Sequence, residues 1–187
     1  MPKENPVKEE TRECIVTALI RLTEQKSLSS ITITELCKAA GVSRMAFYRN
    51  YKSKDDVLAS KLNDLINRYR QVTARARANG SPWYGVDHLC TTFVFFRSNQ
   101  GFMDALLRCG LTHLLANSIS SYVIDTWGNG TCEGDYILTG FSGSLLSCYT
   151  MWRSRGFKET PAQLADIMSR FYTAIPEASR TDEPATL

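Results

Sequence analysis

The chain has 187 residues, 43% of them hydrophobic, and a formal net charge of +3. This length is enough to bury a core, so neither a disulfide nor a metal is needed to hold the fold together. The six cysteines form no Cys-x-x-Cys pair and residues 1–6 lack the apolar stretch of a signal peptide, so we expect a protein of the reducing cytoplasm. No apolar run approaches the roughly 20 residues that cross a bilayer, which argues against a membrane protein.

Positive charge is concentrated in the N-terminal part of the chain. Residues 1–80 contain 15 lysines and arginines against 9 acidic residues, whereas residues 81–187 contain 7 against 10. The basic part is therefore the part that would meet phosphates. An excess of positive charge is more often only a solvated surface, so a nucleic-acid-binding role also requires a sequence motif.

The first predicted helix follows a loose arm over residues 1–6. Ile15, Leu19 and Leu22 recur at helical spacing and predict a helix over about 8–26. The serine-rich stretch that comes next interrupts the apolar periodicity. We therefore expect a break before the next helix.

A short second helix is predicted between Thr32 and Gly41. Thr32-Ile33-Thr34-Glu35 is a capping-box pattern, in which the Thr32 hydroxyl and the Glu35 carboxylate satisfy each other's backbone N–H groups. Gly41 ends the helix, because glycine adopts the left-handed conformation after a helix at least cost. Ser43 then caps a third helix.

This third helix has one apolar and one largely polar face. Phe47 and Tyr51 are four residues apart and are expected to pack inward, while Val42 lies between the two short helices. Two short helices joined by so tight a turn are typical of a helix-turn-helix, in which the second helix enters the major groove of DNA. The side chains left free to face that groove are Arg44, Met45, Tyr48 and Arg49.

The remainder of the chain is also predicted to be helical. Ser53 caps a long amphipathic helix that reaches toward Ala78. Apolar stripes then recur with glycine-rich breaks, and Thr160-Pro161-Ala162-Gln163 starts the last helix. The polar tail, residues 176–187, is expected to be disordered. The fold class predicted is all-α.

The segment from Ile33 to Lys54 resembles the N-terminal domain of the TetR family of transcriptional regulators throughout its length. The most specific matches are Ala40-Gly41-Val42-Ser43, Phe47-Tyr48 and Lys52-Ser53-Lys54. Tyr51 stands where the family usually has phenylalanine, and Cys37 where alanine is common. The resemblance implies a fold with an N-terminal three-helix DNA-binding domain and a larger C-terminal helical domain for ligand binding and dimerisation.

It also implies individual DNA contacts within the helix-turn-helix. These are Thr34, Ser43 and Lys54 to phosphates, Arg44, Met45 and Ala46 to base edges, Tyr48 to the backbone or a thymine methyl, and Arg49 to the backbone. Arg44 is the best candidate for reading a guanine, a contact worth about 1–3 kcal/mol of discrimination. With so few base contacts, much of the affinity would come from salt-sensitive phosphate binding.

Such proteins bind palindromic operators as dimers, with two reading helices about 34 Å apart in successive major grooves. In the TetR family the last two helices of the body pair across the dimer, and here these are predicted at about 134–155 and 161–175. The first of these two helices has a face of small residues that would let another helix approach closely. The alternative is that this face packs within its own subunit. The expected interface residues are Gly140, Gly143, Ser144, Ser147, Leu164, Met168 and Phe171.

Family bodies usually hold a pocket for a small molecule whose binding changes the spacing of the two heads. A pocket for an apolar effector would be lined by aromatic residues of the C-terminal part of the chain. The alternative for most of these residues is that they form the hydrophobic core and touch no ligand. The expected lining residues are Phe93, Phe96, Trp127 and Tyr149.

Enzymatic and metal chemistry find little support. Gly140–Ser144 approaches a nucleophile-elbow pattern, but its last residue is not glycine and no strand precedes it. Cys109 and His113 share helical spacing but lack a second ligand pair. A redox-active Cys132 remains an alternative to an inert thiol. We expect no enzyme, no cofactor and no metal.

The sequence therefore predicts a DNA-binding domain over 1–53 and an effector-binding and dimerisation domain over 54–175. The predicted function is a cytoplasmic, homodimeric transcriptional regulator, a repressor released from its operator by a small molecule. The alternative is a protein-interaction module or coactivator that responds to a partner protein.

Overall fold

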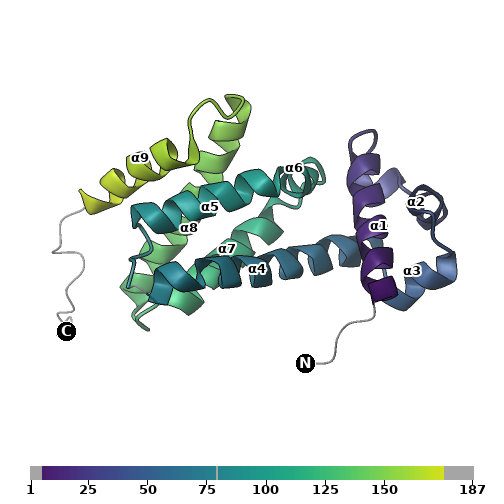
Figure 1. Ribbon diagram of the computed structural model, residues 1–187, viewed down its shortest axis with the longest axis horizontal. Coiled ribbons are helices and arrows are strands. Elements are labelled where there is room, and N and C mark those ends of the chain that lie inside the picture. Colours follow the sequence, from purple (N-terminus) through teal and green to yellow (C-terminus); the bar gives the residue numbers. More distant parts are fainter. Residues whose placement is uncertain (1–5, 79, 175–187) are drawn as a thin grey trace. The chain divides into compact units, whose positions relative to one another are not determined.

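The computed structural model describes residues 6–78 and 80–174, and these residues form helices and turns without strands, as predicted (Figure 1). Residues 1–5 and the predicted disordered tail lie outside the described part. The elements in chain order are α1 (Pro6–Thr23), the 3₁₀ turn η1 (Leu28–Ser30), α2 (Ile33–Ala40), α3 (Arg44–Asn50), α4 (Lys54–Ala78), α5 (Val86–Ser98), α6 (Gln100–Arg108), α7 (Thr112–Trp127), α8 (Cys132–Ser154) and α9 (Pro161–Thr173).

Most predicted helices agree with these bounds to within a few residues, but α6 was not predicted. Helix α5 ends at Ser98, just before one of the expected glycine-containing breaks, Ser98–Gly101. The structure then starts a new nine-residue helix at Gln100 instead of a loop. Phe102, Met103 and Leu106 of this helix are buried, so packing stabilises a segment too short to show a clear helical period on its own.

The contacts divide the chain into two compact units. One contains residues up to 68 together with 99–142, and the other contains 69–98 together with the residues from 143 onward. Helices α4 and α8 each contribute residues to both units. This grouping by packing differs from the expected division at residue 53, which concerns function and remains a prediction.

The first unit is built around the packing of α1 against α2, α3 and α6. Ile15 and Leu19 of α1, Leu36 of α2 and Phe47 of α3 are completely buried. These residues are the apolar members of the helical stripes in the sequence, and their burial removes each from water at a gain of about 1.5–3 kcal/mol per large side chain. Short helices such as α2 and α3 depend on this packing for their stability.

The second unit has an aromatic core, in which α5 lies along α9. Phe93 contacts Trp152 edge to face at 5.9 Å, and Phe96 contacts Tyr149 in the same way at 5.5 Å. Such edge-to-face pairs add to the free energy of burial. The Arg97 guanidinium lies over the rings of Trp152 and Phe157, at 5.8 and 3.9 Å from their centres.

A buried polar cluster joins α4 to α5 within the second unit. The Tyr69 hydroxyl lies 2.6 Å from Thr92 Oγ1 and 3.3 Å from His88 Nε2. His88 is only 1% exposed. Burial, with a further contribution from the Arg77 charge, lowers the pKa of His88 from 6.5 to about 4. His88 is therefore neutral in the folded protein at pH 7.

The lowered pKa predicts an acid-sensitive contribution of His88 to stability. The unfolded chain binds a proton near pH 6.5 while the folded chain resists it until about pH 4. The free energy of unfolding should therefore fall by about 3 kcal/mol as the pH is lowered from 6.5 to 4. Above pH 6.5 His88 is neutral in both states and should cause no such loss. Urea unfolding of wild type and His88→Gln across this range measures the difference. His113→Gln is the matched control, since His113 is exposed, and parallel pH profiles for wild type and His88→Gln would contradict the assignment.

Candidate nucleic-acid interface

The turn between α2 and α3 is a left-handed helix end at Gly41. Gly41 has φ +67°, a conformation that side chains with a Cβ adopt only under strain. The Val42 amide donates to the Cys37 carbonyl at 3.0 Å and the Gly41 amide to the Lys38 carbonyl at 3.3 Å, the pair of bonds that defines a Schellman motif. The chain therefore reverses within two residues, as the sequence predicted.

Helix α3 begins immediately after this turn. The Ser43 hydroxyl accepts a hydrogen bond from the Ala46 amide at 3.0 Å, which confirms Ser43 as the N-cap. Phe47 and Tyr51 are 0% and 3% exposed, so the apolar face of α3 packs inward as expected. The opposite face is thereby directed to solvent.

Five of the predicted contact residues are exposed on or beside this outward face. Met45 is 83% and Tyr48 is 53% exposed, although both are large and partly apolar. The Tyr48 ring meets the edge of Phe47 at 5.3 Å, which restricts its orientation. The other exposed members are Ser43, Arg44 and Arg49, and Ala46 is half-buried beside them.

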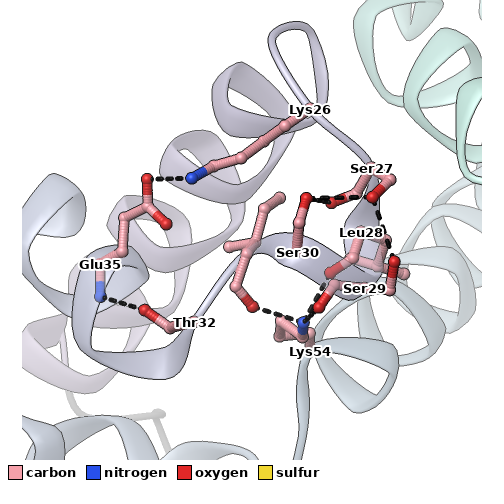
Figure 2. A network of polar contacts seen from close by, with 9 residues as sticks. Lys26, Ser27, Leu28, Ser29, Ser30, Thr32, Glu35 and Lys54 are labelled. Atoms are coloured by element: carbon pink, nitrogen blue, oxygen red, sulfur yellow. Dashed lines mark hydrogen bonds and ion pairs between the residues drawn. The ribbon is translucent and has the colours of Figure 1, made fainter.

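Thr34 is exposed in the first turn of α2. The N-cap of this helix is Thr32, whose hydroxyl accepts from the Glu35 amide at 3.1 Å. The return interaction differs from the predicted capping box, because the Glu35 carboxylate pairs with Lys26 at 2.5 Å (Figure 2). The Lys26 hydrogen bond is the main reason that the pKa of Glu35 is lowered, with a smaller contribution from the Thr32 backbone. No sequence pattern indicated Lys26, which lies nine residues away.

Lys54 is placed differently from a simple phosphate contact. Its ammonium donates to the backbone carbonyls of Leu28 and Ile31, and at longer range to that of Ser29. Figure 2 shows the Lys54 nitrogen among these carbonyls, below the η1 turn. Lys54 thus ties the start of α4 to the connection between α1 and α2, with three acceptors within the chain satisfying its three donors.

The predicted pocket residues are distributed over both units. Phe93, Phe96 and Tyr149 are buried in the aromatic core of the second unit. Trp127 belongs to the first unit, where its ring packs on Tyr122 at 5.8 Å. The structure brings three of the four residues together.

The predicted interface residues differ in their exposure. Phe171 is 66% exposed, and Gly140, Gly143 and Ser147 are also exposed. Met168, in contrast, is buried within its own chain at 5% exposure, and Leu164 is half-buried. The Ser144 hydroxyl lies 2.6 Å from that of Tyr172.

Two further large apolar residues, Ile167 and Met151, were not among the expected interface residues and are 51% and 62% exposed. Ile167 precedes Phe171 by four residues and therefore lies on the same face of α9. That spacing was the sequence signal that could have grouped Ile167 with Phe171 on an exposed face.

The part of the chain that the structure describes offers no group of three or more histidine, cysteine or acidic residues arranged to hold a metal. Within the same residues, no helix combines the length and apolar character needed to cross a membrane.

Comparison with known proteins places the strongest similarity in the N-terminal segment. Residues 15–60 match the family described as bacterial regulatory proteins, tetR family. The chain is 41% identical over 51 residues to the HTH-type transcriptional regulator AcrR of Shigella flexneri, and 36% identical over 63 residues to the regulator EthR of Mycolicibacterium smegmatis. These segments cover 27% and 34% of this chain but only 24% and 29% of the two relatives.

The fold as a whole is similar to that of a solved protein, Lin0861 of Listeria innocua. The TM-score is 0.73 over 94% of this chain and 96% of that one, at 15% sequence identity. The similarity to solved structures therefore extends well beyond the segment that sequence comparison matches.

The position of Lys54 predicts that it contributes mainly to stability. Lys54→Met should lower the free energy of unfolding by about 1–3 kcal/mol, because carbonyls bonded to a charged donor lose their partner. Urea titration measures this, and Lys52→Met is the control because Lys52 is an exposed lysine two residues away. Unchanged stability, with weaker DNA binding and a salt slope smaller by about one, would instead identify Lys54 as a phosphate contact.

Proposed function

We propose that the chain is a cytoplasmic transcriptional regulator of the TetR family that binds double-stranded DNA sequence-specifically, because residues 15–60 match that family. The observation that supports this proposal best is the outward face of α3. Arg44, Met45 and Tyr48 are exposed on a short helix whose Phe47, on the opposite face, is completely buried. Exposed large apolar side chains beside an arginine are what a base-reading surface requires.

The chemistry of this face suggests which contacts specify sequence. Arg44 stands in the first turn of α3, the end of a reading helix that contacts base edges. Its guanidinium can donate two hydrogen bonds to the O6 and N7 atoms of one guanine. Met45 offers only apolar contact, as to a thymine methyl. Exposed Arg49 and Lys52 would add phosphate contacts that are independent of sequence.

Substitutions on this face should weaken DNA binding. Arg44→Ala should cost about 1–3 kcal/mol of affinity for the specific duplex and relax its sequence preference, because a bidentate base contact is lost. Tyr48→Ala should also weaken binding. A gel-shift titration with DNA flanking the protein's own gene measures both, with Lys158→Ala as the control for loss of an exposed positive charge outside the helix-turn-helix. Equal binding by wild type and both variants would show that α3 is not the reading helix.

We further propose that the chain acts as a homodimer through α8 and α9. A Cβ added at Gly143 or at Gly140 would meet no atom within 4 Å, so packing within the chain does not account for the glycines. In the second unit, the exposed face of α9 presents Ile167 and Phe171. Exposed apolar side chains of this size are typical of protein interfaces.

The dimer proposal predicts that Phe171→Glu and Gly143→Leu yield monomers. The first variant places a charge in an apolar interface, and the second adds bulk where two helices would approach closely. Sedimentation velocity over a range of concentrations gives the association state. Val72→Glu is the matched control, since Val72 is 53% exposed on α4. A wild-type chain that stays monomeric, or variants that stay dimeric, would refute the proposed interface.

The finer function that we propose is a repressor released from a palindromic operator by a small apolar effector. The family resemblance and the aromatic core around Phe93, Phe96 and Tyr149 support an effector site in the body. An effector acts by binding one spacing of the two heads better than the other. A thermal-shift screen with small apolar compounds, followed by operator release, tests this role, and a flat screen with capture of a specific protein partner would favour the interaction-module alternative.

A further inference from the structure

Arg12 of α1 reaches two other helices of the first unit. Its Nε donates to the Tyr51 hydroxyl at 3.2 Å, and one terminal nitrogen donates to Ser60 Oγ at 2.7 Å. The same nitrogen pairs with the Asp64 carboxylate at 3.2 Å. Ser60 and Asp64 lie on α4, whereas Tyr51 directly follows α3. One side chain therefore connects α1, the end of α3 and α4.

Tyr51 holds the C-terminal end of α3 in two ways. Its amide donates to the Phe47 carbonyl at 2.9 Å, and its own backbone is already extended at φ −144°. The ring is only 3% exposed and packs against Phe47 at 6.1 Å. The Arg12 guanidinium also lies 5.7 Å from the centre of the ring, within the range of a cation–π contact.

Burial of an aromatic ring at this inward-facing position does not require the Tyr51 hydroxyl. A phenylalanine would fill the same space and make the same ring contacts with Phe47. It would leave Arg12 Nε without this acceptor in a site where the arginine side chain is only 24% exposed. Burial raises the pKa of Tyr51 above 10, so the hydroxyl stays neutral and accepts the hydrogen bond throughout the physiological range.

We propose that Tyr51 is a positioning residue for the DNA-reading helix, whose hydroxyl, held by Arg12, fixes the C-terminal end of α3 against α1 and α4. Helix α3 has only seven residues, so a small rotation about its buried Phe47 moves both Arg44 and Tyr48. The Gly41 turn and the Ser43 cap hold its N-terminal end, and the bond to Arg12 holds the other. Recognition of base edges requires such a fixed geometry, so this inference depends on the proposed function.

The test uses Tyr51→Phe, which removes one oxygen atom and keeps the ring. The probe is a duplex selected from a random pool by the wild-type chain, compared with an unrelated duplex of equal length. We expect Tyr51→Phe to bind the selected duplex about three- to tenfold more weakly, the size of one hydrogen bond. Affinity for the unrelated duplex and the salt slope should not change, because Tyr51 is only 3% exposed and is not expected to bind phosphate.

The specificity ratio, which is the affinity for the selected duplex divided by that for the unrelated duplex, separates positioning from a purely structural role. If Tyr51 had only a structural role, Tyr51→Phe would lower stability but leave this ratio unchanged in the folded chain. Tyr69→Phe is the matched control, because it removes another buried, hydrogen-bonded tyrosine hydroxyl and should leave both affinities unchanged. Arg12→Lys keeps the positive charge but loses the Nε donor to Tyr51, and it also alters the contacts with Ser60 and Asp64, so its loss should be at least as large as that of Tyr51→Phe. In the double variant the two losses should add only in part, because both variants remove the hydrogen bond between Arg12 and Tyr51.

The outcomes distinguish this inference from the proposed function. If wild type selects no duplex, the proposed function fails. If wild type selects one and a folded Tyr51→Phe keeps its specificity ratio, the positioning role is refuted and the function stands. Should Tyr51→Phe fail to fold, as judged by circular dichroism, Arg12→Lys alone decides between these results.

Discussion

The left-handed turn at Gly41 is the constraint on which the arrangement of the N-terminal helices depends. Its two hydrogen bonds to Cys37 and Lys38 end α2, and the Ser43 cap starts α3 two residues later. The short connection leaves α3 few orientations, and burial of Phe47 selects among them. With the helix fixed in this way, one face is committed to the core and the other, with Arg44 and Tyr48, is left to solvent.

Two long basic side chains extend this constraint to the neighbouring helices. Lys54 binds the carbonyls around η1, and Arg12 binds Tyr51, Ser60 and Asp64. The positive charges of Lys54 and Arg12 are therefore bound to groups of the same chain. The sequence shows only that the N-terminal part is basic and does not distinguish these two charges from the others. The positive charges on solvent-exposed residues, such as Arg44, Arg49 and Lys52, are those that remain available to a polyanion.

The roles of residues in the body were less predictable than those in the helix-turn-helix. In α9 the family resemblance suggested Phe171 and Met168 alike as interface residues, whereas the structure buries Met168 and exposes Ile167, which had not been suggested. Both are large and apolar, and the direction of a helix face depends on its neighbours. For the same reason the sequence did not show that Trp127 packs in a different unit from Phe93 and Tyr149.

Local chemistry determined the elements that the sequence could predict: the caps at Thr32, Ser43 and Thr160, the glycine that ends α2, and the inward pair Phe47 and Tyr51. Each depends on residues within a few positions, so the chain needs no knowledge of its fold to specify them. The partners of Lys26, Lys54 and Arg12 are 9, 23–26 and 39–52 residues away. Only tertiary structure brings such groups within hydrogen-bond distance, and it therefore decided which charges stabilise the fold and which face solvent.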